Sequence, residues 1–335
     1  MTEPILSIRD LSVIFDIRPR GAWPWTPSLR LHAVSGLSVD VAPGEILGLV
    51  GESGSGKSTL ARAVVGTVPV TSGEIRFEGS DLAAMSPQDR RRHRRNVQMV
   101  FQDPLAALNP RMTVGDIIAE PLITHDPATP RAEVKARVRE IMDRVGLLPN
   151  LINRYPHEFS GGQCQRIGIA RALILRPKLL ICDEPVSALD VSVQAQVVNL
   201  LRELQSDFGL SMIFIAHDLS VVKHISDRIV VMYLGRPMEV GPAEAITRTP
   251  HHPYTQGLIA SVPIPDPRLE RARDRPLMEG ELPSPLAPPS GCVFRTRCPK
   301  ARPDCARAVP PMEVVADRHR VACPYHEAQK VLQQA

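Results

Sequence analysis

The sequence lacks any apolar run approaching the roughly 18 residues that a membrane-spanning helix needs. Its start, MTEPILSIRD, is acidic and does not resemble a secretory signal peptide. An excess of one charge is also missing, because 40 lysines and arginines stand against 36 aspartates and glutamates. The resulting net charge of +4 is too small to indicate nucleic acid as a partner. We therefore expect no nucleic-acid partner, and we expect any membrane association to be peripheral.

The composition is that of a folded protein with room for about two domains. Of 335 residues, 43% are hydrophobic and 23% are charged, close to globular averages, which excludes wholesale disorder. The length excludes a peptide hormone or a small disulfide scaffold. The one strongly basic run, residues 90–95, is typical of a solvated helix face.

Proline divides the chain, since 17 of its 33 prolines lie between Pro237 and Pro324. Before about residue 235, short runs of valine, isoleucine and leucine alternate with helical patterns, which predicts an α/β domain around a largely parallel, buried sheet. We expect strands at residues 46–50, 179–182, 212–216 and 228–233, a turn at Gly235 into 236–240, and helices at 131–145, 163–175 and 191–205.

The segment from about residue 241 is expected to be a loop-rich extension. Prolines in stretches such as VPIPDPR and ELPSPLAPPSG exclude long helices and central strands. We therefore expect a first domain over residues 1–240 and an extension over residues 241–335, held by something other than an apolar core.

A phosphate-binding motif follows the first expected strand. The segment GESGSGKS matches GxxxxGK[ST] and lies between strand-like ILGLV and helical KSTLARAVV. Glycines in such a motif let backbone amides point at phosphate oxygens, and the helix adds the positive end of its dipole. Lys57 is expected to bind the β and γ phosphates, Ser58 to bind Mg2+, and Thr59 to donate to phosphate. The motif comprises Gly51, Glu52, Ser53, Gly54, Ser55, Gly56, Lys57 and Ser58.

A second apolar strand, LLIC, ends in two acids, Asp183 and Glu184. Ligands of open α/β sheets bind beyond the carboxyl ends of the strands, which is where these acids are expected. Asp183 would orient Mg2+, and Glu184 would polarise the water that attacks the γ phosphate.

Five further segments occur in the order found in ABC-type ATPases. The segment FSGGQ, residues 159–163, resembles the family signature, and Gln102 in VFQDP matches the Q-loop. The segment SALD, ending at Asp190, matches the D-loop, and His217 in IFIAHD matches the switch histidine. Phe15 lies where the family places an aromatic under adenine, although Trp23 and Trp25 are alternatives. Residues 5 to about 240 thus resemble an ABC-type ATPase.

The resemblance implies a P-loop NTPase fold of ABC type, with a helical subdomain over about residues 103–175. It implies that Gln102 senses the γ phosphate and binds Mg2+, and that His217 holds the γ phosphate and the attacking water. It also implies that the signature closes over ATP held by an opposing subunit. The residues placed at that closing interface are Ser160, Gly161, Gly162, Gln163 and Asp190.

The end of the chain resembles the extension of peptide-importer ATPases. The matching segments are TPHHPYT, residues 249–255, and ELPSPLAPPSGC, and the likeness extends to about Tyr325. The insertion at residues 17–30 looks like that of the second ATPase subunit of this group. The resemblance implies that the chain forms a heterodimer with a related ATPase at the cytoplasmic face of the inner membrane. It also implies two membrane permeases and an external peptide-binding protein as further partners. Nickel and glutathione importers share the same extension, so they stay alternatives.

The six cysteines fall into two kinds. Cys164 and Cys182 lie in an expected helix and strand, and we expect both to be buried apolar thiols. Four others are spaced by 5, 6 and 17 residues, without the CxxC pairs of zinc ribbons: Cys292, Cys298, Cys305 and Cys323. A reducing compartment disfavours disulfides and favours a metal. The family resemblance implies a four-iron four-sulfur cluster, with zinc or unligated thiols as alternatives.

Two other classes of function are alternatives to an importer ATPase. A soluble ABC ATPase acting on DNA or ribosomes could use residues 90–95 as a contact patch, but the small net charge and the extension disfavour it. A regulatory module without catalysis is disfavoured because the catalytic residues are all present.

Overall fold

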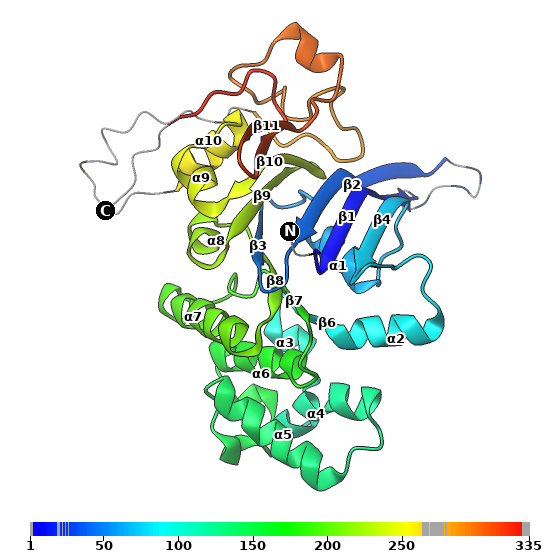
Figure 1. Cartoon of the computed structure of the whole chain (residues 1–335), viewed down its shortest axis with the longest axis vertical. Coiled ribbons are helices and arrows are strands. Elements are labelled where there is room, and N and C mark those ends of the chain that lie inside the picture. The colour runs from blue at the N-terminus through cyan, green and yellow to red at the C-terminus, as the bar shows by residue number, and fades with distance from the viewer. Residues whose placement is uncertain are drawn as a thin grey trace. The chain divides into compact units, whose positions relative to one another are not determined.

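The computed structural model describes residues 3–18, 21, 23, 25, 27–262, 268, 278 and 280–329 (Figure 1). The chain forms two compact units that interleave along the sequence. The first unit comprises Met1–Leu6, Val41–Ile46 and Arg76–Ala216, and the second comprises Ser7–Asp40, Leu47–Ile75 and His217–Ala335.

The first unit is built on three parallel strands in the order β8-β7-β6. Strand β7 pairs with β6 from Leu179 onward and with β8 on its other side. Every residue of β7 and β8 is buried, as expected of central parallel strands with both faces covered. The strands are β6 (Val97–Val100), β7 (Leu179–Asp183) and β8 (Ser211–Ala216), and β5 (Ser80–Asp81) pairs with the end of β4.

Helices make up the rest of the first unit. Three of them, α4, α5 and α6, pack on one another as a helical layer (Figure 1). Its buried side chains include Ile117, Ile118, Val138, Met142 and Ile167. The helices are α2 (Pro87–Asn96), α3 (Pro104–Ala107), α4 (Val114–His125), α5 (Arg131–Arg144), α6 (Gly161–Leu173) and α7 (Val191–Phe208), with short turns η1 (Pro149–Leu151) and η2 (Pro156–Glu158).

The second unit carries strands in the order β11-β12-β10-β9-β3, and β2, β1 and β4 form a separate sheet. Strand β9 runs parallel to β3 and antiparallel to β10. The strands are β1 (Leu6–Ile17), β2 (Leu29–Val41), β3 (Ile46–Val50), β4 (Ser72–Phe77), β9 (Arg228–Tyr233), β10 (Arg236–Pro242), β11 (Glu313–Ala316) and β12 (His319–Val321). The helices are α1 (Lys57–Val65), α8 (Leu219–Ile225), α9 (Ala243–Arg248) and α10 (Pro253–Ser261), with a short turn η3 (Pro303–Ala306).

The expected elements before residue 241 are confirmed with shifts of one to a few residues at their ends. The turn between β9 and β10 has positive φ at Leu234 (44°) and Gly235 (77°), as a two-residue hairpin of this twist requires. The basic run lies in α2 and is solvent-exposed, apart from the buried His93 and half-buried Arg95. Both Cys164 and Cys182 are fully buried, as expected.

The extension departs from expectation in what holds it. Its described part does contain long loops, but α10 is a nine-residue helix and β12 joins the sheet beside β10. Apolar contacts also hold it, because Phe294 is fully buried with its ring centroid 5.3 Å from those of Tyr233 and Tyr254. The expectation that an apolar core would not hold the extension is therefore wrong. Proline spacing limits secondary structure but not the burial of the side chains between prolines. The stretch VPIPDPR lies almost entirely outside the described residues.

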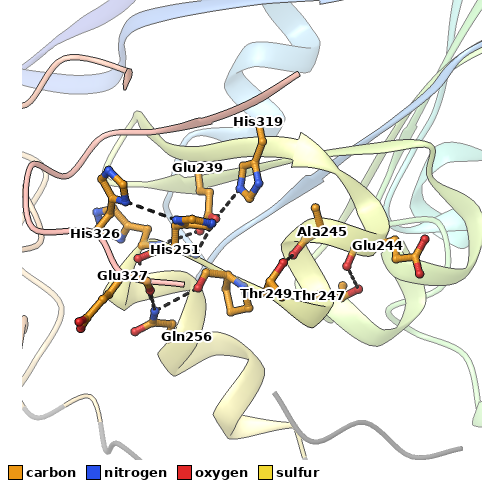
Figure 2. Close-up of polar contacts among 12 residues, drawn as sticks. Glu239, Glu244, Ala245, Thr247, Thr249, His251, Gln256, His319, His326 and Glu327 are labelled. Atoms are coloured by element: carbon orange, nitrogen blue, oxygen red, sulfur yellow. Dashed lines mark hydrogen bonds and ion pairs between the residues drawn. The ribbon is translucent and has the colours of Figure 1, made fainter. Parts of the chain in front are cut away.

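A buried carboxylate forms a second anchor for the extension (Figure 2). Glu239 of β10 accepts from the backbone N–H of His251 at 2.8 Å and of His252 at 3.0 Å. It also bonds the ring of His319 in β12, whose Nε2 lies 2.8 Å from Glu239 Oε1. The ring of His326 reaches His251, with 3.3 Å between the Nδ1 atoms. Burial of Glu239 is thus balanced by hydrogen bonds from two separate segments, residues 251–252 and β12.

Among the described residues, no helix combines the length and apolar character needed to cross a bilayer.

Candidate functional site

The phosphate-loop motif forms a tight curl between β3 and α1. Gly56 caps α1 with φ of 95°, and a Cβ added there would lie 2.0 Å from the carbonyl oxygen of Ala33. A Cβ at Gly51 would lie 2.1 Å from the carbonyl oxygen of Met232. Both positions therefore require glycine, because the clash is with backbone that cannot move aside. The sequence motif thus specifies a loop conformation as well as a set of functional groups.

Lys57 lies buried inside this curl. Its ammonium group donates to the carbonyl oxygens of Gly51 at 2.8 Å and Glu52 at 3.0 Å, and to Ser55 Oγ at 3.2 Å. The charge is therefore held at the N-terminus of α1, where the helix dipole favours an anion. Ser58 and Thr59 follow in the first turn of α1 and are half-buried.

The two acids lie at the end of β7, in the first unit. Asp183 is buried as the last residue of the strand. Glu184 has a left-handed backbone, with φ of 46°, and its N–H donates to the carbonyl oxygen of Ile215 in β8 at 3.0 Å. Such a conformation is costly for a non-glycine residue and is often found at functional positions. It turns the chain away from the sheet directly after the strand.

The structure brings Gln102 to Glu184. The Gln102 Nε2 amide donates to Glu184 Oε2 at 2.8 Å. The two residues meet because β6 and β7 are parallel neighbours, with Val100 paired to Cys182, so that their carboxyl ends lie side by side. After Gln102, the Asp103 carboxylate accepts from the first amides of α3 at 2.9 and 3.0 Å, which fixes the turn.

The signature segment begins α6 with a capping box. Ser160 Oγ accepts from the Gln163 N–H at 3.3 Å, and Gln163 Oε1 accepts from the Ser160 N–H at 2.9 Å. A Cβ at Gly162 would lie 2.6 Å from Val193 Cγ1, so this glycine allows the close approach of α7. Ser160, Gly161 and Gln163 are exposed. This second helix N-terminus is therefore presented to solvent.

The D-loop aspartate, Asp190, caps the neighbouring helix α7. Its Oδ1 accepts from the Val193 N–H at 3.0 Å and from Ser192 Oγ at 2.7 Å. These two hydrogen bonds, that from Ser192 first, lower the pKa of Asp190. Asp190 is thus ionised and locally satisfied at the edge of the signature helix.

The other residues expected to bind the nucleotide lie in the second unit. His217 follows β8 as an exposed residue, one position before Asp218 caps α8. Phe15 is half-buried near the end of β1, and Trp23 and Trp25 are exposed and stack on each other with ring centroids 5.1 Å apart. The roles expected of these residues stay predictions.

The four cysteines of the extension gather without forming a metal site. Burial raises the pKa of the Cys292 and Cys298 thiols, and it raises that of Cys323 to about 11. The charges of the other three cysteines add to the rise at Cys323. Within the described part of the chain, however, no three histidine, cysteine or acidic side chains are placed to hold a metal ion. As placed, these thiols do not fit a metal centre.

The sequence does not predict the partners of the phosphate loop. Glu52 is paired with Arg297, and its backbone N–H donates to the Tyr254 hydroxyl at 3.0 Å. No local spacing signals these contacts, because Tyr254 is 202 and Arg297 is 245 residues from Glu52.

Comparison with known proteins gives two family matches. Residues 34–187 match the ABC transporter family, and residues 238–305 match the oligopeptide/dipeptide transporter C-terminal region. The oligopeptide transport ATP-binding protein OppF of Salmonella typhimurium is 61% identical over 319 residues, which covers 95% of each chain. OppF of Haemophilus influenzae is 58% identical over 321 residues, covering 96% of this chain and 97% of its own.

A solved structure agrees on the fold. The structure of cbiO1 from Clostridium perfringens, part of the ABC transporter complex cbiONQ, has a TM-score of 0.62 at 28% identity. It covers 73% of this chain and 90% of its own. The α/β fold of ABC type expected from the sequence is thereby confirmed. The phosphate loop, the signature helix and these likenesses together show that the chain belongs to the ABC transporter family, among its oligopeptide transport ATP-binding proteins.

Proposed function

We propose that the chain is the ATP-hydrolysing subunit of a membrane ABC transporter that imports oligopeptides or dipeptides. The observation that carries the proposal is the curl of the phosphate loop around the Lys57 ammonium at the start of α1. Phosphate oxygens of ATP would replace the carbonyl oxygens that now accept from Lys57. The relatives named for oligopeptide transport support the cargo.

The binding residues divide by chemistry. The loop from Gly51 to Thr59 would bind the phosphates, and Phe15 would stack on the base. Ser58, Gln102 and Asp183 offer hydroxyl, amide and carboxylate oxygens, the donors that Mg2+ prefers. When bound, Mg2+ would neutralise charge on the β and γ phosphates.

Hydrolysis needs a proton acceptor beside the attacking water, and we assign that role to Glu184. The water oxygen bonds to the γ phosphorus, the bond to the bridging oxygen breaks, and Glu184 takes the water proton. ADP and inorganic phosphate are the products. The amide of Gln102 fixes Glu184 Oε2 at 2.8 Å, and His217 would hold the γ phosphate and the water.

The exposed signature supports a two-subunit site. Its amides and Ser160 would bind the γ phosphate of ATP held by a related ATPase subunit, with Asp190 at the same interface. Two permeases and an external peptide-binding protein would complete the importer. The chain itself would lie at the cytoplasmic face of the inner membrane. The ATPase domain would comprise residues 1–240, with the helical subdomain at 103–175, and the importer extension would comprise residues 241–335. The family matches at 34–187 and 238–305 support this division.

We propose that the four cysteines of the extension bind a four-iron four-sulfur cluster, which requires their thiols to rearrange from positions that do not hold a metal ion. Four free, half-buried cysteines in the extension support it, because a cluster of this kind is held by four cysteine thiolates. Protein purified without oxygen should contain about four iron atoms per chain. Colourless, iron-free protein would end this proposal.

The experiment for the whole proposal is MgATP binding and turnover by the chain assembled with its partner ATPase and permeases in vesicles. Lys57→Ala should abolish tight binding and peptide uptake. Uptake of nickel or glutathione in place of peptides would change the assigned cargo but leave the assignment as an importer ATPase intact. Salt-sensitive stimulation by nucleic acid, with no uptake, would favour the soluble class instead.

A further inference from the structure

The C-terminal extension contacts the phosphate loop directly. Arg297 Nη1 donates to both carboxylate oxygens of Glu52, at 3.0 Å to Oε1 and 2.8 Å to Oε2. Only 9% of the Arg297 side chain and 25% of the Glu52 side chain are exposed. A pair this shielded from water is screened little, and loss of one partner leaves the other charge uncompensated.

The guanidinium of Arg297 is held in place by Tyr233. It lies 5.9 Å above the ring centroid of Tyr233, and its Nη1 is 3.5 Å from the Tyr233 hydroxyl oxygen. Tyr233 ends β9 and is fully buried. The position of Arg297 is therefore fixed by the sheet that also carries β3 and its loop.

A second contact fixes the backbone of the same loop residue. The hydroxyl of Tyr254, a fully buried residue of α10, accepts from the Glu52 N–H at 3.0 Å. Glu52 is thus held by its side chain and by its main chain, each time from residues after 250. In a phosphate loop the direction of each backbone N–H decides whether it can bind a phosphate oxygen, so this hydrogen bond helps to fix the conformation of the loop.

The segment that carries Arg297 is itself anchored. Phe294 lies three residues earlier and packs against Tyr233 and Tyr254, with centroid distances of 5.3 Å. Cys292 and Cys298 bracket the segment. The contact to Glu52 is therefore part of a packed structure and not a chance meeting of surface side chains.

We infer that Arg297 and Tyr254 are positioning residues for nucleotide binding, through which the extension sets the phosphate loop. Arg297 neutralises the Glu52 carboxylate, which would otherwise repel an incoming triphosphate, and Tyr254 orients the Glu52 amide. The inference rests on the proposed function, because it takes residues 51–58 as the phosphate site. Both residues act through Glu52 of the phosphate loop, so we expect the chemical step to be unaffected.

The first test is Arg297→Met in the full chain, with MgATP affinity measured by calorimetry and turnover measured in the assembled transporter. We expect affinity to fall about tenfold, which corresponds to about 1.4 kcal/mol, with kcat at saturating MgATP within about twofold. Arg297→Lys should recover part of the loss. The matched control is Arg295→Met, because the Arg295 guanidinium bonds Ser290 within the extension and should leave affinity unchanged.

A double-mutant cycle separates charge from general support. In a Glu52→Gln background there is no carboxylate to neutralise, so Arg297→Met should change affinity less than about threefold. An equal loss in both backgrounds would overturn the inference. If Arg297→Met does not fold, Tyr254→Phe serves instead, and it should weaken MgATP binding at unchanged kcat; unchanged affinity there would equally overturn it.

Lys57→Ala distinguishes failure of the inference from failure of the function. If Lys57→Ala keeps parental MgATP affinity, the phosphate site itself is misassigned. If Lys57→Ala abolishes binding while Arg297→Met and Tyr254→Phe bind as the parent does, only the role of the extension is refuted.

Discussion

The side-chain amide of Gln102 donates to the Glu184 carboxylate at 2.8 Å, across 82 residues of sequence. Parallel pairing of β6 with β7 places both residues at the same sheet edge. The proposed base is therefore already bonded to the residue proposed to sense the γ phosphate. Any shift of Gln102 toward a ligand changes the hydrogen bonding of Glu184.

Glu184→Gln should keep MgATP binding and lower turnover by roughly 10²- to 10⁴-fold, because the amide cannot accept a proton from water. Gln102→Ala should give a smaller loss, since the carboxylate remains but is no longer oriented. Single-turnover ATP hydrolysis by the assembled transporter measures both. Gln98→Ala, on β6 near Gln102, is the matched control and should hydrolyse ATP at the parental rate. Parental turnover by Glu184→Gln would remove it from the role of base.

Ser160→Asp should stop ATP turnover while leaving MgATP affinity unchanged. Aspartate caps a helix as well as serine does, so α6 stays intact, but its charge repels a γ phosphate. Ser160→Asn caps equally and carries no charge, so it should retain most of the turnover. Calorimetry and ATPase assays on the assembled pair give the two readouts. Normal hydrolysis by Ser160→Asp would argue against a phosphate at this helix end.

Gly162→Ala should destabilise the chain by about 1–3 kcal/mol, because the new Cβ would lie 2.6 Å from Val193 Cγ1. Gly161→Ala is the matched control, since its Cβ would make an ordinary 3.7 Å contact with Leu189. Urea unfolding monitored by circular dichroism compares the two. Adding Val193→Ala should restore part of the stability lost in Gly162→Ala; no recovery would show that the clash is not the cause.

Stability should fall as pH drops from 6.5 toward 4, because burial lowers the pKa of His252 to about 4 although Glu239 opposes the shift. The unfolded chain binds a proton at His252 below about pH 6.5 and the folded chain does not, which amounts to roughly 3 kcal/mol by pH 4. Burial lowers the pKa of His251 in the same direction. Desolvation raises the pKa of Glu239, but hydrogen bonds from His319, Thr255 and two backbone amides outweigh it and leave the pKa below its usual value. The loss due to Glu239 therefore begins only below about pH 4.5.

His252→Asn should flatten this pH dependence, because asparagine can keep the cap bond that His252 Nδ1 makes to the Tyr254 N–H without binding a proton. Thermal unfolding midpoints between pH 4.5 and 7 give the slope. The exposed His157→Asn is the control and should follow the parent. Identical slopes for His252→Asn and the parent would contradict the assignment.

Much of the fold followed from local pattern. The sequence predicts β3, the loop and α1 because an apolar run, a glycine-rich segment and a helical pattern follow one another directly. It predicts β7 because four apolar residues precede Asp183. The helix that follows the signature segment is predicted as well, although its capping box between Ser160 and Gln163 is not. The extension is harder to predict, because its proline content carries no information on the burial of Phe294.

The sequence by itself determined the family, the phosphate loop and the order of the catalytic motifs, because each motif consists of residues a few positions apart in the sequence. Only the tertiary structure decided which distant residues share a bond: Gln102 with Glu184, Glu239 with His319, and Glu52 with Arg297. The physical reason is that these pairs depend on strand order and on how the extension packs, which are properties of the folded chain. The local spacing of residues in the sequence therefore does not predict these pairs.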